Sequence, residues 1–457
     1  MKKSNVNMLS GSITKGLLSM TIPIIIMNVM QKLFNIIDMT ALRYFSDDMS
    51  VGAVGTCGSL TTLCTSLVIG ISAGANIIVA KRIGAGDKDR TDRAVVTSIL
   101  LAVTGGLLLM VIGVTFADTF LKLTNCPDTL LQRATLYFRI HFWGVPIQLL
   151  YNFCASILRA TGNTKKPMYY LITGGIIKVI FTIFFLIVFD LDVAGVALAT
   201  IISNLVTSTL AFRSLLKSGI LNINFKNIRF DIEELKQILF IGVPTGLQSA
   251  MYSMANVIII SVVNSFGENA TTGISIANQF DGILYQIVHA PALATMPYVA
   301  QNIGAGNINR VKQSIVRSVL ITTAFGVTFG SLSAFFSGNL ASIMSSTPEV
   351  IDYARQKMII ISSTYFLTGI NEAMGGVLKD MGKPIIPTIA TMMFMCLFRF
   401  LWVYVIYPVL PQNLTFLYLV WPVGWILSII TLLIAFFPAI SKLQKKLLAQ
   451  KTEIPQI

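Results

Sequence analysis

The sequence predicts an all-α polytopic membrane protein with twelve transmembrane helices, arranged as two pseudo-symmetric six-helix bundles. First, only 12% of the 457 residues are charged and 54% are hydrophobic, whereas soluble domains carry about 25% charged residues. Second, the mean hydropathy is +0.75, and the apolar runs are long and continuous. Such runs favour helices over the short alternating strands of a membrane barrel. Third, a motif returns about 220 residues later in the chain.

The repeat is clearest at the end of the second apolar run. The segment VAKRIGAGDKDR at 79–90 returns as VAQNIGAGNINR at 299–310, and Pro127 returns as Pro348. Each copy holds six apolar runs, an even number, so both copies enter the membrane in the same orientation. We therefore expect a parallel repeat related by an axis along the membrane normal, with a cavity between the halves.

The apolar runs give the predicted spans in chain order, since a helix needs about 20 apolar residues to cross a bilayer. They are 16–42, 52–80, 92–117, 133–158, 167–189, 193–216, 237–264, 271–302, 312–337, 355–378, 385–408 and 414–440. The resulting organisation is an N-terminal lobe at 1–216, a polar and basic cytoplasmic linker at 217–236, and a C-terminal lobe with a cytoplasmic tail at 237–457.

The distribution of basic residues predicts the orientation. With the N-terminus inside, 25 of the 34 Lys and Arg fall in inner segments, six in outer segments (including Lys357) and three within spans. This asymmetry follows the positive-inside rule and places both termini in the cytoplasm. The expected location is the cell inner membrane. Because the basic residues flank spans, the net charge of +14 indicates contact with the lipid bilayer and no nucleic-acid partner. We expect a monomer.

Catalytic and metal-binding patterns are not evident in the sequence. The five cysteines form no CxxC pair, and His141 and His289 each stand in apolar context, which is typical of packing residues. The IGAG segment is not a nucleotide loop, because no strand precedes it and no GK[ST] follows. We therefore expect no enzyme activity and no cofactor beyond H⁺ or Na⁺ as a coupling ion.

A polar stripe marks the first span. Asn28, Gln31, Asn35 and Asp38 are spaced three or four residues apart and share one helix face. Polar contact between helices would explain the amides, but a carboxylate in a span costs about 2.5–3.5 kcal/mol and favours a functional role for Asp38.

The second half keeps the polar face without the acid. At an offset of 221 the stripe becomes Ser249, Tyr252, Asn256 and Ile259. Charge coupling on this face would therefore be confined to the N-terminal half. The predicted substrate cavity comprises Gln31, Tyr252, Asn256, Asp281, Glu372, Arg399, Met251 and Met254; the methionines would supply a deformable lining, although methionine is more often gap-filler.

Two deep cations occupy equivalent positions of the repeat. Lys178 lies mid-way along the fifth span, and Arg399 is its counterpart 221 residues later. By repeat geometry the partner of Lys178 is Asp38, while Asp281 or Glu372 would neutralise Arg399, because buried charges generally pair.

The chain resembles the multidrug and toxic compound extrusion (MATE) family. The resemblance is carried by Pro23 with Asp38 fifteen residues on, VAKRIGAGD, LRATGNTKKP, DVAGVALAT, VAQNIGAG, LKDMGKP and WPVGW, which together span nearly the whole chain. It implies two six-helix lobes around a central cleft. It also implies export of small organic, often cationic, compounds against an inward flow of Na⁺ or H⁺.

The resemblance also implies a coupling site in the N-terminal lobe. Asp38 matches the family's coupling acid, and Asn152 and Thr200 match two further cation-site positions. Asn35, which lies on the polar stripe with Asp38, completes the predicted site. Where many members carry an Asn and an Asp in the fifth span, this chain has Lys178 and Thr182. An ammonium repels Na⁺, so we expect H⁺ coupling, with Asp38 and Lys178 separating in one conformation.

Other functions stay open at this level. A flippase for lipid- or polyisoprenoid-linked substrates would use basic groups such as Lys178 and Arg399 for phosphate. A membrane enzyme would need a nucleophile, metal or acid–base cluster at one depth. A scaffold without transport would tolerate Asp38→Asn.

Overall fold

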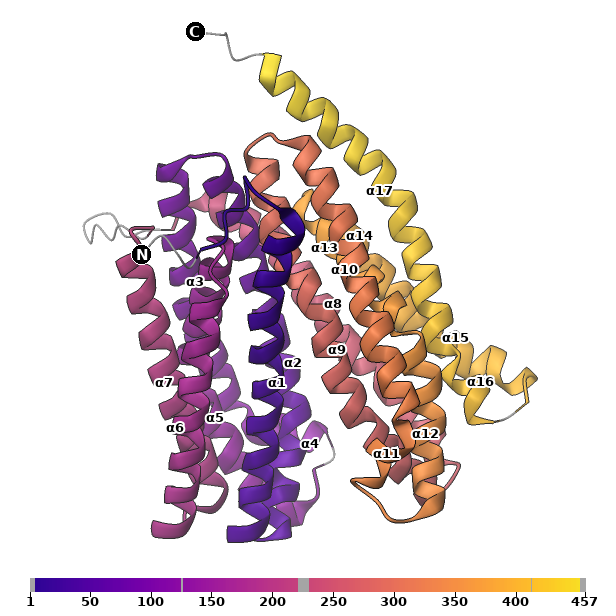
Figure 1. Cartoon of the computed structure of the whole chain (residues 1–457). Helices are drawn as coiled ribbons and strands as arrows, with labels where there is room; N and C mark the ends of the chain where they lie inside the picture. Colours follow the sequence, from indigo (N-terminus) through magenta and orange to yellow (C-terminus); the bar gives the residue numbers. More distant parts are fainter. Residues whose placement is uncertain (1–4, 125, 221–229, 412, 453–457) are drawn as a thin grey trace. The chain divides into compact units, whose positions relative to one another are not determined.

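The first repeat is a series of long helices. The computed structural model describes residues 5–124, 126–220, 230–411 and 413–452, and the helices of this repeat lie alongside one another (Figure 1). They are α1 (Ile13–Phe45), α2 (Asp48–Gly84), α3 (Lys88–Thr115), the short α4 (Ala117–Leu123), α5 (Asp128–Ala160), α6 (Lys165–Val188) and α7 (Asp192–Ser218).

The second repeat begins with helices of the same lengths as those of the first repeat and ends with shorter, interrupted helices. Its elements are α8 (Ile232–Asn264), α9 (Glu268–Gly304), α10 (Ile308–Phe335), α11 (Ser337–Ser342), α12 (Pro348–Ser363), α13 (Tyr365–Asp380), α14 (Ile385–Thr391), η2 (Met392–Leu397), α15 (Phe398–Leu401), η3 (Trp402–Ile406), η4 (Tyr407–Val409), α16 (Leu414–Tyr418) and α17 (Val420–Thr452). Helices α1 and α8 both have 33 residues, α2 and α9 both have 37, and α3 and α10 both have 28. The predicted duplication is therefore confirmed.

The two repeats differ in backbone regularity. Helix α5 is continuous, whereas its counterpart is broken at Thr364 into α12 and α13. Helix α6 is also continuous, but its counterpart contains two π-helical segments, η2 and η3. Such segments are rare and often accompany functional sites.

The described helices pack as two compact units. Unit 1 comprises Met1–Val6 and Ile26–Gly246, and unit 2 comprises Asn7–Ile25 and Leu247–Ile457. Helices α1 and α8 therefore each contribute to both units. These bounds differ from the predicted lobes at 1–216 and 237–457, because the first part of each repeat's first helix packs within the other unit. Part of the predicted linker, residues 221–229, lies outside the described residues.

The repeated IGAG motif forms the same turn twice. Gly86 and Gly306 have φ angles of +71° and +68°, which glycine adopts without strain. The next helix then begins with a side-chain cap: Arg90 N donates to Asp87 and Arg310 N to Asn307. In each repeat the motif therefore ends one helix and begins the next.

A glycine interface fixes α8 against α2 within unit 1. A Cβ atom on Gly74 would lie 2.4 Å from Ile238 O, and one on Gly242 would lie 2.6 Å from Ile71 Cα. Gly70 and Gly246, each one turn along its helix, approach equally closely. Both helices therefore carry a G-x-x-x-G pair that permits backbone contact, as in many membrane helix pairs.

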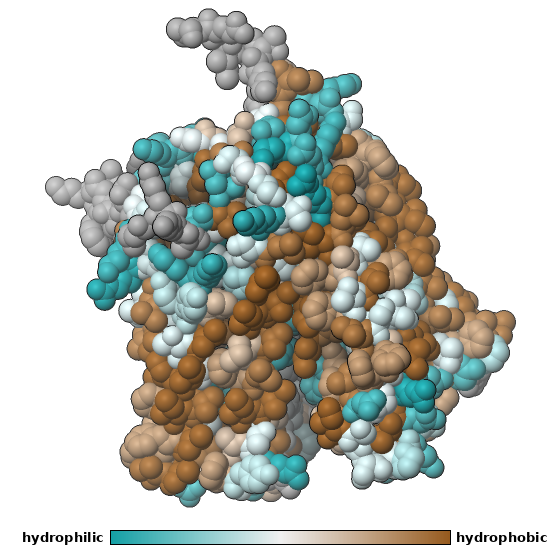
Figure 2. Space-filling model, in the orientation of Figure 1, coloured by the Kyte–Doolittle hydropathy of each residue, from teal (hydrophilic) through white to brown (hydrophobic). Residues whose placement is uncertain are grey.

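Eight described helical segments are long and apolar enough to cross a membrane by length and composition. They are Ile13–Phe45, Met49–Gly84, Lys88–Thr115, Lys165–Val188, Asp192–Ser218, Ile308–Phe335, Ile385–Val409 and Leu414–Ala449. The other predicted spans fall on α5, α8, α9 and the α12–α13 pair, of which α5 and α12 each carry four charged residues. On the face shown in Figure 2, apolar residues cover much of the helix lengths and hydrophilic residues gather toward their ends.

Candidate functional site

The candidate coupling site lies between α1 and α6 in unit 1. Lys178 forms an ion pair with Asp38, as predicted, and Thr182 donates a 3.3 Å hydrogen bond to the other carboxylate oxygen. Lys178 and Thr182 are four residues apart and so share one face of α6. Asp38 is only 5% exposed and Thr182 is fully buried. The carboxylate is therefore held by two donors from a single helix turn.

A partly buried aromatic pair on α5 belongs to the same region. The rings of Tyr137 and His141 stack with centroids 5.9 Å apart, and His141 lies within electrostatic range of Lys178. Neither ring nitrogen of His141 makes a hydrogen bond in the described part of the chain. The sequence predicted only a packing role for His141, because its apolar neighbours gave no sign of a nearby ion pair.

The remaining residues of the predicted coupling site are not joined to this ion pair. Asn35 and Gln31 lie on α1 with exposed side chains, and Thr200 donates to Val196 O on its own helix. Among the described residues, Asn152 shows no hydrogen bond to Asp38 or Lys178. Its role and those of Asn35 and Thr200 remain predictions.

Unit 2 contains a second buried lysine–aspartate pair. Lys357 Nζ lies 2.9 Å from Asp281 Oδ2 and also donates to the Asn278 side chain. The same ammonium lies 5.8 Å from the centroid of the Trp421 ring, and Arg399 Cζ lies 5.2 Å from that centroid. We call these five residues the Trp421 cluster. Lys357, which was counted with the outer segments, has a side chain only 3% exposed and packs inside unit 2.

The carboxylates predicted to neutralise Arg399 form their ion pairs elsewhere. Asp281 pairs with Lys357, and Glu372 Oε2 lies 3.5 Å from His289 Nε2. Tyr285 donates a 3.3 Å hydrogen bond to Glu372 and stacks on His289. The neutralisation of Arg399 by one of these two acids therefore stays a prediction.

One face of α9 links these two charged groups. Ser275, Asn278, Gly282, Tyr285 and His289 follow one another at spacings of three or four residues, and none of them is fully buried. This spacing places them on a single helix face. Polar groups within a span are expected to face protein or water and not hydrocarbon.

The other predicted cavity residues are only partly described. Met251 is half-buried, and its carbonyl accepts a 3.3 Å hydrogen bond from Cys396 Sγ. The side chains of Tyr252, Met254 and Asn256 lie outside the described residues. No group of three or more His, Cys, Asp or Glu residues is arranged to hold a metal ion in the portion of the chain that was searched.

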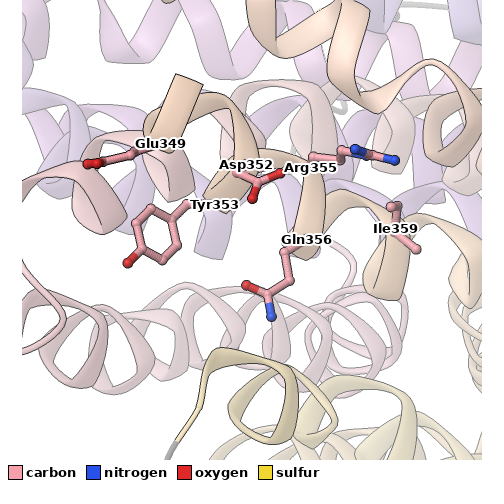
Figure 3. A pocket seen from close by; sticks show the side chains of 6 residues that line it. All are labelled: Glu349, Asp352, Tyr353, Arg355, Gln356 and Ile359. Carbon is pink, nitrogen blue, oxygen red and sulfur yellow. The ribbon is translucent and has the colours of Figure 1, made fainter. Parts of the chain in front are cut away.

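An unpredicted pocket of about 660 Å³ lies on α12 in unit 2. Figure 3 shows its lining side chains, with Gln356 directed toward the neighbouring helix; Gln356 donates a 2.6 Å hydrogen bond to Thr415, at the start of α16. The lining residues are Glu349, Asp352, Tyr353, Arg355, Gln356 and Ile359. With two acids and one base, this pocket is mildly acidic and solvent-exposed.

Two further ion pairs hold the helix ends of unit 1. Arg133 contacts both carboxylate oxygens of Asp47, at 2.6 and 2.7 Å, and its hydrogen bonding holds the pKa of Asp47 well below the usual range. Arg82 contacts Glu234, the third residue of α8, at 2.9 Å. Burial raises the pKa of Glu234, and Arg82 partly offsets this effect.

Tandem helical repeats with ionisable pairs on apolar helices define an integral membrane transport protein. Residues 23–184 and 244–405 each match the MatE family, so the chain belongs to the multidrug and toxic compound extrusion family. The match covers both repeats and confirms the predicted resemblance.

Individual relatives cover most of the chain. A probable multidrug resistance protein, YoeA of Bacillus subtilis, is 27% identical over 83% of this chain and 83% of its own length. An FAD transporter of Shewanella oneidensis is 26% identical over 80% of this chain and 82% of its own length. The crystal structure of MATE in the straight conformation aligns with a TM-score of 0.88 at 21% identity, covering 97% of this chain and 100% of that one, and supports the fold.

Proposed function

We propose that this protein is a proton-coupled antiporter that exports small organic compounds, often cationic, by alternating access. The observation that carries the proposal is the buried Asp38–Lys178 ion pair in unit 1. Family membership and the relative named as a probable multidrug resistance protein support the export function. The distribution of Lys and Arg supports a cell inner membrane with both termini in the cytoplasm.

The chemistry around Asp38 favours H⁺ over Na⁺. A hard cation such as Na⁺ requires several oxygen ligands, and the residues hydrogen-bonded or ion-paired to Asp38 supply one hydroxyl and one ammonium. The ammonium occupies the position next to the carboxylate and repels a metal cation. A proton needs no such coordination shell and can neutralise the carboxylate directly.

The ion pair suggests a two-state cycle. With Asp38 ionised, its attraction to Lys178 ties α1 to α6. Protonation of Asp38 removes that attraction and leaves Lys178 as a buried cation without its counter-charge, which is strongly unfavourable. Unit 1 would then rearrange until Lys178 reaches water or another acceptor. Thr182 would keep Asp38 in place in both states, because a hydroxyl can bond either form of the acid.

Efflux from sealed vesicles tests the coupling ion. Inside-out vesicles receive a pH gradient or a Na⁺ gradient separately, and uptake of a cationic dye is recorded. We expect uptake with the pH gradient alone, loss of uptake in Asp38→Asn, and a comparable loss in Lys178→Met. Asp118→Asn, which alters an exposed ion pair at the predicted outer surface, serves as the control and should transport normally. Transport by the wild type driven by Na⁺ alone would contradict proton coupling.

A second candidate function is a flippase for lipid- or polyisoprenoid-linked substrates. The feature that favours it is the presence of two buried cations, Lys357 and Arg399, in unit 2, because a phosphate-linked substrate needs basic groups. Binding assays with a cationic dye and with an anionic lipid precursor separate the two functions. An exporter of organic cations should bind the dye, whereas a flippase should bind only the precursor.

A further inference from the structure

Lys32 is a cation without a counter-charge near the middle of α1. It lies three residues beyond residue 29, the centre of the predicted span 16–42. That distance is about 5 Å along the helix axis, whereas the hydrocarbon core extends about 15 Å to either side of its centre. The Lys32 side chain is exposed, and it forms no ion pair or hydrogen bond with any residue that the structure describes. Hydrocarbon strongly disfavours an ammonium at this depth.

The surface of α1 is divided into an apolar face and a polar face. The apolar face carries the exposed side chains of Ile22, Ile26, Leu33 and Ile37. The polar face carries Asn28, Gln31, Lys32 and Asn35, of which all but Asn28 are exposed. Helical periodicity places these two sets on opposite sides of the helix. The apolar face therefore meets lipid, and the exposed polar face borders water, because polar groups within a span avoid hydrocarbon.

Helix α2 leaves open space beside this polar face. A Cβ atom on Gly55 would lie 3.8 Å from Met39 Cε, and Met39 lies two turns beyond Lys32 on the same side of α1. Helices α1 and α2 are consecutive, with only residues 46–47 between them, and run antiparallel. Thr62, seven residues beyond Gly55, therefore lies near the level of Lys32 and is exposed. One turn before it, a Cβ atom on Gly58 would meet no atom within 4 Å.

The free polar groups next to this space are hydrogen-bond donors. Asn28 lies one turn before Lys32 and is only 9% exposed, and its Nδ2 makes no hydrogen bond among the described residues. The Lys32 ammonium has three N–H donors and no acceptor. Asp38, the one acid of α1, is already held by the Lys178 ammonium. An ammonium beside an unpaired amide N–H suits an anionic oxygen acceptor such as a carboxylate or a phosphate.

We propose that Lys32 and Asn28 bind the carboxylate or phosphate group of an organic molecule in the space beside α1 and α2 of unit 1. This inference rests on the proposed exporter function, and it extends the exported compounds from cations to molecules that carry an anionic group. Gln31 and Asn35, on the same face, would contact the polar body of that molecule. A phospholipid headgroup offers the same chemistry, so the experiment separates the two sources.

Equilibrium binding to the full-length protein in phosphatidylcholine nanodiscs tests the site. The probes are FMN and riboflavin, which share a fluorescent ring and differ by one phosphate. Hydrogen bonds to charged groups are strong, so we expect wild type to bind FMN at least about tenfold more tightly than riboflavin. The assay contains no ion gradient, so failure of proton-coupled export and failure of this site are separate results.

Variants of the two donors should change the preference for FMN in a graded way. Lys32→Gln should reduce it to within about twofold, whereas Lys32→Arg, which keeps the charge, should retain most of it. Asn28→Ala removes a neutral donor and should weaken FMN binding about fivefold. A lysine that only stabilised the fold would change the affinities for FMN and riboflavin together. Lys15→Gln, at an exposed lysine near the start of the same helix, makes the same change of charge and should behave as wild type.

Adding phosphatidylglycerol to the bilayer identifies the source of the anion. If this lipid weakens FMN binding more in wild type than in Lys32→Gln, a lipid phosphate competes for the site. If it affects the two proteins equally, the site takes the anionic group of a soluble molecule. Equal affinities of wild type for FMN and riboflavin, or an FMN preference that survives in Lys32→Gln, would overturn the proposal.

Discussion

At the scale of single residues, the ionisable groups on the long helices act in small sets whose net charge sets their chemistry. Asp38 and Lys178 are balanced, so one proton changes the state of the pair. Lys357 and Asp281 form a second pair in unit 2, and Lys357 also donates to the Asn278 side chain.

The Arg82–Glu234 pair allows a stability prediction. Glu234 is 2% exposed, so Arg82→Gln leaves a buried carboxylate without its counter-charge, and we expect a loss of about 2–4 kcal/mol. Burial already raises the pKa of Glu234, so this loss should be present at neutral pH and shrink as the pH falls through that raised value, when the acid becomes neutral. Thermal unfolding in detergent measures it.

The double variant Arg82→Gln, Glu234→Gln is the control for this prediction, because it removes both charges together. It should recover most of the lost stability and show no such pH dependence. A single variant as stable as wild type at neutral pH would argue against a structural role for the pair.

Asp47 allows a prediction with the opposite pH dependence. Its side chain caps α2 by accepting from Ser50 N and pairs with Arg133. Because the carboxylate is about half exposed, we expect Asp47→Ala to cost only about 1 kcal/mol. The pKa of Asp47 is lowered in the folded state, so its contribution is complete above the unfolded value of about 4 and is lost as the pH falls through the folded value.

Thermal melting of wild type and Asp47→Ala across a pH series provides the measurement. The difference in melting temperature should be constant near neutral pH and decline in acid. A difference that grows toward low pH would be inconsistent with a lowered pKa.

At the scale of elements, α8 and α9 have distinct structural tasks. The first part of α8 is fixed to α2 in unit 1 by facing glycines and by the Arg82–Glu234 ion pair. Helix α9 combines an apolar face, which packs on α12 through residues such as Ala277 and Ala354, with the polar face that links two charged groups. Backbone contact gives α8 a fixed position, whereas α9 packs by its apolar face and keeps its polar side chains on another face.

The glycine interface predicts a sharp effect of one methyl group. Gly74→Ala places a Cβ 2.4 Å from Ile238 O, so α2 and α8 must separate, and we expect at least about 2 kcal/mol of destabilisation together with reduced efflux. The control is Gly105→Ala in α3, where a Cβ meets no atom within 4 Å; it should be neutral or slightly stabilising. Equal melting temperatures for the two variants would refute the close contact.

At the scale of the whole molecule, an even number of spans in each repeat gives both copies the same orientation. In the proposed topology the α11–α12 connection lies outside and the end of α17 lies inside, as the basic residues predict. Four of the five native cysteines, at 57, 126, 154 and 396, are buried, so they add little background to the labelling of introduced cysteines.

Thiol labelling tests this topology. Ser346 and Lys446 are both exposed. We expect a membrane-impermeant maleimide to label Ser346→Cys in intact cells and Lys446→Cys only after permeabilisation. The wild-type protein, with its own cysteines, measures the background. Labelling of Lys446→Cys in intact cells would reverse the proposed orientation.

The sequence by itself determined the fold class, the duplication and the family, and it identified Asp38 with Lys178. Hydropathy and repeated turns are local properties, and a chain built twice predicts which helices correspond. The Asp38–Lys178 pair was predictable because an acid in the first span and a base in the fifth each need a partner.

Only the tertiary structure decided the partners in unit 2 and the division into compact units. Lys357 lies near the start of an apolar run, and packing of α12 on α9 buries its side chain beside Asp281. Likewise the first part of α8 belongs to unit 1, because its glycines pack directly on those of α2. Both outcomes depend on which helix faces meet. The packing of the chain decides this, and the sequence of a single segment does not show it.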